Sequence, residues 1–234
     1  MTLLAADGLE VRYGPIIAVR GLSLTLNAGE ILCLVGPNGA GKSSTTLALS
    51  GAVRAAAGTV QFDRRDITQT SAEDRSDLGV ALVPEGRRIF QRMTVADNLL
   101  VACRPGLRPQ DDDWLLDLFP ILRSRLRQQA GLLSGGEQQQ LAIARAMLRR
   151  PRVLIVDEPS LGLSPRFVQV VYDAMRVLRD RGVALLVVEQ SARRAMALAD
   201  RVALMRSGRL VIEGRPGELA GNPDFDKAYF GAET

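Results

Sequence analysis

A glycine-rich stretch has the residue types and spacing of a phosphate-binding loop. Its pattern is G-x-x-x-x-G-K-S, and its members are Gly36, Pro37, Asn38, Gly39, Ala40, Gly41, Lys42 and Ser43, followed by Ser44. In this pattern the glycines let backbone N–H groups point at phosphate oxygens, the lysine reaches the β- and γ-phosphates, and the serine hydroxyl ligates Mg²⁺. The stretch predicts a site for the phosphates of a nucleotide and for Mg²⁺; the alternative is a chance glycine-rich turn.

Two adjacent carboxylates follow an apolar run later in the chain. Residues 153–156 are entirely aliphatic, and Asp157 and Glu158 come directly after them. A carboxylate buried at the end of a strand is costly unless a cation or hydrogen-bond donors meet it. We therefore expect Asp157 to hold Mg²⁺, directly or through water, and Glu158 to orient the water that attacks a phosphate. The alternative is a strand that simply stops at a charged turn.

A third group of residues has the pattern of a helix start. Ser134 is a suitable N-cap, and Glu137, three residues later, completes a capping box. The glycines between them, Gly135 and Gly136, leave backbone N–H groups uncovered, which suits an anion at the helix N-terminus. Helix capping and anion binding are both open on these residues alone.

Short apolar runs predict the strands that position these residues. They cover residues 31–35, 80–83, 153–156 and 183–188, and each has the composition of a buried parallel strand. A short helix is expected directly after the phosphate loop, closed by Gly51. Glu85 follows the second run, at the carboxyl end of a strand, where open α/β sheets bind ligands.

Two further regions surround this core. Residues 3–26 and 58–62 alternate apolar and polar side chains, which predicts a small antiparallel sheet. Tyr13 belongs to it, and its ring either stacks on a nucleotide base or is an ordinary strand aromatic. Residues from about 88 to 150 have helical periodicity. We predict an α/β fold: a phosphate-loop core with a small antiparallel β subdomain and an inserted helical subdomain, in a single domain spanning residues 1–234.

The composition excludes several classes of function. The chain has no histidine, which rules out histidine-based catalysis and histidine metal sites. Its net charge of +4 is modest. No apolar run approaches the roughly 18 residues that span a bilayer, and the first residues do not resemble a signal peptide. Cys33 and Cys103 lie apart in apolar settings and are expected to be reduced, buried thiols. We expect a cytoplasmic protein that binds no nucleic acid.

Taken together, these motifs resemble those of the ATP-binding-cassette (ABC) ATPases over the whole chain. Leu133, Ser134, Gly135, Gly136 and Glu137 match the signature that separates this family from other phosphate-loop ATPases. The resemblance implies that Tyr13 stacks on adenine and that Glu158 is the catalytic glutamate. It also implies a head-to-tail dimer, with itself or a sister ATPase, in which ATP lies between one cassette's phosphate loop and the other's signature. Transmembrane permease subunits would contact the segment around Glu85, which places the protein on the inner face of the cell membrane.

Two residues depart from the usual pattern of the family. Glu85 stands where these ATPases usually have a glutamine, and Gln190 where they usually have a histidine that acts near the γ-phosphate. Residues 83–90 and 188–190 resemble the shorter ATPase subunit of branched-chain amino acid importers. The alternatives are an ABC ATPase for another cargo, such as urea, amides or a lipid, and a soluble cassette protein that works outside transport. A phosphate-loop kinase or GTPase is disfavoured by the signature.

Overall fold

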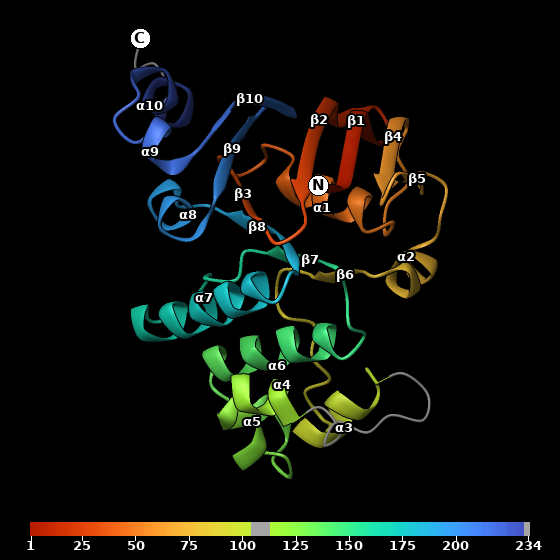
Figure 1. Ribbon diagram of the computed structural model, residues 1–234, viewed down its shortest axis with the longest axis vertical. Helices are drawn as coiled ribbons and strands as arrows, with labels where there is room; N and C mark the ends of the chain where they lie inside the picture. Colours follow the sequence, from red (N-terminus) through yellow and green to blue (C-terminus); the bar gives the residue numbers. More distant parts are fainter. Residues whose placement is uncertain (104–112, 232–234) are drawn as a thin grey trace.

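The computed structural model describes residues 1–103 and 113–231 and contains two sheets with helices packed against them (Figure 1). The smaller sheet is antiparallel and has the order β2-β1-β4-β5. Its strands are β1 (Thr2–Tyr13), β2 (Ile16–Asn27), β4 (Ala57–Phe62) and β5 (Arg65–Asp66). The alternating pattern of residues 3–26 therefore forms the predicted hairpin, and residues 58–62 pair with its first strand.

The larger sheet has the order β10-β9-β3-β8-β7-β6. Its strands are β3 (Ile31–Val35), β6 (Val80–Val83), β7 (Val153–Asp157), β8 (Ala184–Glu189), β9 (Arg201–Arg206) and β10 (Arg209–Gly214). All pairs are parallel except that of β9 and β10. The register sets Val35 opposite Glu189, and Asp157 opposite Val188. The carboxyl ends of β3, β8 and β7 therefore meet at one edge of the sheet.

Both faces of the larger sheet are buried, as the aliphatic runs predict. Along β3, Cys33 and Val35 belong to the core on one face, and Leu32 and Leu34 to the core on the other. The second face packs against the antiparallel sheet and α1, whereas the first packs against α6, α7 and α8 (Figure 1). Burial on two sides fixes the strands whose ends carry the predicted site.

The helices fill the connections between strands. They are α1 (Lys42–Leu49), α2 (Ala72–Leu78), α3 (Val95–Leu100), α4 (Asp113–Leu118), α5 (Pro120–Ser124), α6 (Gly135–Met147), α7 (Pro165–Asp180), α8 (Ala192–Leu198), α9 (Pro216–Leu219) and α10 (Pro223–Phe230), with a 3₁₀ turn at Ala130–Leu132. The helices α3 to α6 lie between β6 and β7 in the chain and group together in Figure 1, where α6 packs against the sheet and α7, and α3 to α5 lie farther from the sheet. Both α3 and α6 begin with capping boxes, at Thr94 and Ser134.

The structure corrects some details of the sequence-based expectations. Cys103 is half-buried, unlike the buried Cys33. The sequence also predicts that the helix opening at Ser134 runs to about Arg149, before Pro151, whereas it ends at Met147 and Arg150 adopts a left-handed conformation. Asp111, where the acidic residues 111–113 predict another helix start, lies outside the described residues. Within the described part of the chain, no helix combines the length and apolar content needed to cross a bilayer.

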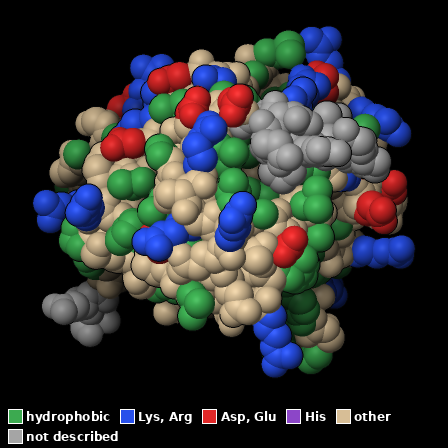
Figure 2. Space-filling model, turned by 90° about the horizontal axis from the view of Figure 1, so that it is seen from below, with side chains coloured by type: hydrophobic (Ala, Val, Ile, Leu, Met, Phe, Trp, Pro, Cys, Tyr) green, Lys and Arg blue, Asp and Glu red, His purple; other side chains and the backbone are tan. Residues whose placement is uncertain are grey.

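The end of the molecule formed by the helical group carries a mixed surface. Figure 2 shows lysine and arginine side chains scattered among uncharged ones on this face, rather than gathered in one patch. A continuous basic stripe is the usual electrostatic footprint of nucleic-acid binding. The described residues of this face do not form one.

Candidate nucleotide-binding site

A pocket of about 450 Å³ lies where the phosphate loop meets the carboxyl ends of the parallel strands. It is lined by Tyr13, Ala18, Asn38, Gly39, Ala40, Gly41, Lys42, Ser43, Ser44, Glu85, Glu158 and Gln190. The loop residues, Glu85, Glu158 and Gln190 converge because β3, β8, β7 and β6 lie side by side in one sheet, and Tyr13 and Ala18 join them from the antiparallel sheet. Tyr13 is the last residue of β1, and it lies at the rim of the pocket with 45% of its surface exposed.

The backbone of the loop requires glycine at two positions. Gly36 has φ 155°, and a Cβ there would lie 2.1 Å from the carbonyl oxygen of Met205. Gly41 has φ 101°, and its Cβ would lie 2.4 Å from the carbonyl oxygen of Ala18. Gly41 is also the N-cap of α1 and provides no side chain to cap the helix. The first N–H groups of α1 are therefore open to an anion.

Lys42 is buried and folded back onto the loop. It is 5% exposed, and its Nζ donates to the carbonyl oxygens of Gly36 (2.8 Å) and Pro37 (3.0 Å). Burial lowers the pKa of Lys42, and the nearby charges of Glu158, Asp157 and Glu85 act in the opposite direction. An ammonium held by two neutral carbonyls in a pocket with three carboxylates can transfer its hydrogen bonds to phosphate oxygens.

Asp157 carries an oxygen atom that no group of the chain satisfies. The side chain is 5% exposed at the end of β7, and its Oδ1 is buried without a hydrogen-bond partner. Burial raises the pKa of Asp157, while a hydrogen bond with Ser43 lowers it. A buried, unpartnered carboxylate oxygen beside a serine hydroxyl suits an oxygen-seeking divalent cation such as Mg²⁺. The residues present therefore fit the predicted metal.

Glu158 lies just beyond β7 and is held in place by its neighbours. Its backbone has φ 50°, a left-handed conformation that costs energy for a residue with a side chain. Its N–H donates to the carbonyl oxygen of Val188 (3.0 Å). Gln190 Nε2 donates to Glu158 Oε2 over 2.7 Å. The amide that the sequence placed near a γ-phosphate thus contacts the proposed catalytic carboxylate.

The five signature residues lie outside this pocket. Ser134 caps α6, with its N–H donating to Glu137 (2.7 Å) and its hydroxyl accepting from the Glu137 N–H (3.4 Å). A Cβ on Gly136 would lie 2.3 Å from the ring of Phe167 on α7, so this glycine permits close packing of two helices. Leu133 is buried, whereas Ser134 is exposed. The structure does not bring the signature to the phosphate loop of its own chain.

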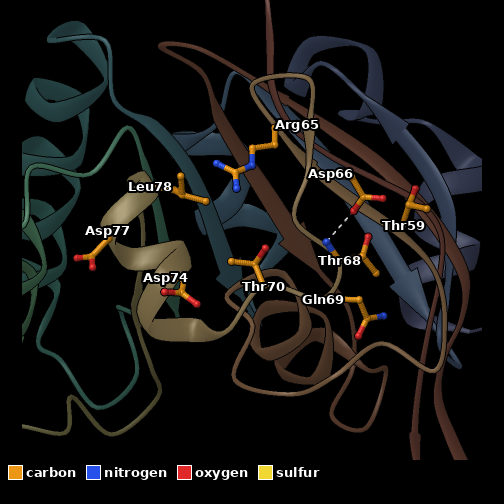
Figure 3. A pocket seen from close by; sticks show the side chains of 9 residues that line it. All are labelled: Thr59, Arg65, Asp66, Thr68, Gln69, Thr70, Asp74, Asp77 and Leu78. Carbon is orange, nitrogen blue, oxygen red and sulfur yellow. Dashed lines mark hydrogen bonds between the residues drawn. The ribbon is translucent and has the colours of Figure 1, made fainter.

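Another hollow, between β4, β5 and α2, has a different character (Figure 3). Its polar groups already serve the local backbone, since Asp66 accepts from the N–H of Thr68 (2.7 Å) and the Thr68 hydroxyl accepts from the N–H of Val60 (2.8 Å). Asp74, also on its wall, pairs with the hydroxyl of Ser71 at the start of α2. This hollow is therefore a product of turn and helix capping.

Sequence reasoning missed several contacts that support the site. Ser160, which the family resemblance places in the conserved loop after the Asp157–Glu158 strand, and Tyr172 both donate buried hydrogen bonds to Glu189, next to Gln190. Tyr229 of α10 donates to the carbonyl oxygen of Gln190 (2.6 Å). The one signal in the sequence was that Glu189 ends an apolar strand, as Asp157 does.

Comparison with known proteins finds a family model and several relatives that match this chain. The family model described as ABC transporter matches residues 19–161. The chain is 39% identical to the high-affinity branched-chain amino acid transport ATP-binding protein BraG of Pseudomonas aeruginosa, over 98% of this chain and 100% of that protein. It is 36% identical to a probable branched-chain amino acid transport ATP-binding protein LivF of Archaeoglobus fulgidus (95% and 96%), and 32% identical to the lipopolysaccharide export system ATP-binding protein LptB of Haemophilus influenzae (100% and 99%).

Solved structures agree in fold. A nucleotide-free ATP-binding cassette from an ABC transporter superposes with a TM-score of 0.89 at 24% identity, covering 99% of this chain and 100% of that one. The ADP conformation of the cassette MJ1267 gives a TM-score of 0.85 at 25% identity, with 99% of each chain covered. The predicted fold class is confirmed. The family model matches more than half of the chain, and the relatives match it over nearly the full length of both sequences. This chain therefore belongs to the ABC transporter family.

Proposed function

We propose that this chain is the ATP-hydrolysing, energy-coupling subunit of a membrane importer for branched-chain amino acids. The observation that carries the ATPase part is the pocket that brings the phosphate loop together with the Glu158–Gln190 pair, with the unpartnered oxygen of Asp157 on the residue before Glu158. The cargo is supported by the relatives named for branched-chain amino acid transport, whose lengths match that of this chain. Export of a lipid is the second candidate, on the similarity to LptB.

The residues of the pocket have complementary roles in this proposal. The adenine stacks on Tyr13, and the loop N–H groups with Lys42 hold the phosphates. Ser43 and Asp157 hold Mg²⁺, which when bound neutralises charge on the phosphates. Within the described residues, no three carboxylate, cysteine or histidine side chains form a metal site of their own.

Glu158 is placed to act on the attacking water. Its carboxylate can accept a hydrogen bond from the water and align it with the γ-phosphate. Gln190 occupies one carboxylate oxygen of Glu158 as a donor, which leaves the other oxygen for the water. The amide thus orients the base and does not itself exchange a proton.

The signature is proposed to serve a second cassette. The exposed N-terminus of α6 at Ser134 is separated from its own phosphate loop, so an anion at this helix start would come from another chain. A head-to-tail dimer places ATP between the loop of one cassette and Ser134 of the other. ATP then closes the dimer, and hydrolysis opens it.

A groove of about 370 Å³ between β6 and α6 suits the permease subunits. The residues that line it include the apolar Val83, Ala142 and Ala146 and the arginines Arg87, Arg88, Arg145 and Arg149, of which Arg149 already pairs with Asp77. The Nε of Arg145 is buried without a hydrogen-bond partner, and burial lowers the pKa of this arginine. We infer that the permease inserts a short apolar segment bearing a carboxylate, which holds the protein at the inner face of the membrane.

Two experiments test the proposal. The purified chain should hydrolyse ATP in the presence of Mg²⁺, and a lack of hydrolysis under conditions that favour dimers would remove the ATPase function. Deletion of the gene should abolish high-affinity uptake of leucine, isoleucine and valine by the source cell. Loss of a different solute's transport, with these three unaffected, would refute the cargo and leave the ATPase standing.

A further inference from the structure

A buried carboxylate that the mechanism does not use lies beside the site. Glu189, the last residue of β8, is 2% exposed. Burial raises the pKa of its carboxyl group. Carboxylates in protein interiors are retained only where donors or cations satisfy them, so the groups around Glu189 indicate what its charge is used for.

Both oxygens of Glu189 are occupied by hydroxyl groups from other elements. The hydroxyl of Ser160 donates to Oε2 over 2.8 Å, and the hydroxyl of Tyr172 on α7 donates to Oε1 over 2.7 Å. Arg194 on α8 donates to Ser160 Oγ over 3.0 Å, which places a positive charge near the carboxylate. The carboxylate thus ties the end of β8 to the loop after β7 and to α7.

The segments joined by Glu189 are those that carry the two proposed hydrolytic residues. Ser160 is two positions after Glu158, and Gln190 is the next residue after Glu189. The backbone adds a further tie, from the N–H of Glu158 to the carbonyl oxygen of Val188. The 2.7 Å contact between Gln190 and Glu158 is therefore supported by a buried, fully bonded carboxylate next to it.

We propose that Glu189 is a positioning residue for ATP hydrolysis, which through Ser160 and Tyr172 fixes the Glu158 segment against the Gln190 segment. The inference rests on the proposed ATPase function. Glu189 touches neither nucleotide nor water in this scheme and acts only through the two segments. Since a shift of about 1 Å in a reacting group can cost on the order of 10²-fold in rate, loosening this tie should slow hydrolysis while the phosphate loop still binds ATP.

Tyr172→Phe is the mildest test, because it removes one hydroxyl and keeps the ring that packs in the core. We expect kcat per folded molecule to fall by roughly tenfold, with KM for ATP within about twofold of the unmodified chain. Ser160→Ala should give a similar loss, and Ser160→Thr, which retains the hydroxyl, should recover most of it. Ser124→Ala is the control, since its hydroxyl also donates a hydrogen bond, to the backbone carbonyl of Ile121 (2.9 Å), but in the helical group.

The outcomes separate the two proposals. If the unmodified chain hydrolyses ATP and kcat is unchanged in Tyr172→Phe and Ser160→Ala, only the positioning role is overturned. The positioning role is also overturned if these variants only melt at lower temperature, with normal kcat per folded molecule. A fall in kcat with KM preserved, recovered in Ser160→Thr and absent in Ser124→Ala, supports the role. If the unmodified chain does not hydrolyse ATP, both proposals are overturned.

Discussion

Replacing Glu158 by glutamine removes the negative charge and the basicity of this side chain while keeping its contacts. Glutamine has nearly the same size, and its carbonyl oxygen can still accept the hydrogen bond that Gln190 Nε2 donates over 2.7 Å. The left-handed backbone at this position and the bond from its N–H to Val188 do not depend on the carboxylate. The substitution therefore removes the proposed base and one negative charge, and little else.

The magnitude follows from these two losses. Loss of a general base lowers the rate by about 10²-fold or more, which corresponds to about 2.7 kcal/mol in the barrier. The charge of Glu158 is one of three carboxylate charges that act on Lys42, so it also repels a γ-phosphate bound at Lys42. Because Glu158 is only half-buried, solvent screens this repulsion, and we expect ATP to bind equally well or up to about tenfold more tightly.

Single-turnover hydrolysis, ATP titration and size-exclusion chromatography would measure these effects. Glu158→Gln should form a dimer with ATP but not with ADP, because ATP is bound and not consumed. Glu85→Gln is the matched control: it removes the same charge from the same pocket, and we expect it to keep turnover within about threefold. Hydrolysis by Glu158→Gln at the rate of the unmodified chain would refute the assignment of the base.

The remaining predictions concern other parts of the chain. Lys42→Ala should abolish ATP binding or hydrolysis, and normal turnover would refute the phosphate loop. Asp157→Asn should raise the Mg²⁺ concentration needed for half-maximal rate, which a Mg²⁺ titration measures. Ser134→Arg should leave ATP binding by a single chain intact while blocking ATP-dependent dimerisation; unchanged turnover and dimerisation would leave only the capping role. Arg75→Met should lower the free energy of unfolding by roughly 2–4 kcal/mol, measured by denaturant titration, because it removes the donor of four hydrogen bonds to backbone carbonyls of α1 and the loop before α2.

Local patterns in the sequence predicted the elements and the convergence of the site. Aliphatic runs marked the buried strands, and a parallel sheet brings the carboxyl ends of its strands to one edge, so the phosphate loop, Asp157 and Gln190 had to meet there. The capping box at Ser134 was equally visible, since it depends on residues three apart. These features need no knowledge of distant contacts.

Contacts between distant segments were beyond the reach of such patterns. The glycine at position 136 is required by the ring of Phe167, which lies on the next helix along the chain. The buried state of Glu189 depends on donors from the loop after β7 and from α7, and periodicity does not distinguish a satisfied carboxylate at a strand end from an exposed one. The left-handed backbone of Glu158 likewise arises from the tertiary structure around it.

The replacement of the usual histidine by Gln190 removes from the site a group that could change its charge near neutral pH. A histidine titrates near neutral pH, whereas a glutamine amide donates the same hydrogen bond throughout the physiological range. Three contacts hold Gln190 in place. Its side-chain amide donates to Glu158, and its backbone carbonyl oxygen accepts from the hydroxyl of Tyr229. The preceding residue, Glu189, is fixed by its own hydrogen bonds. The chain contains no histidine, and in the proposed mechanism Glu158 accepts the proton of the attacking water. The rigid hydrogen bonds around Gln190 then serve to keep that one carboxylate in the orientation that hydrolysis requires.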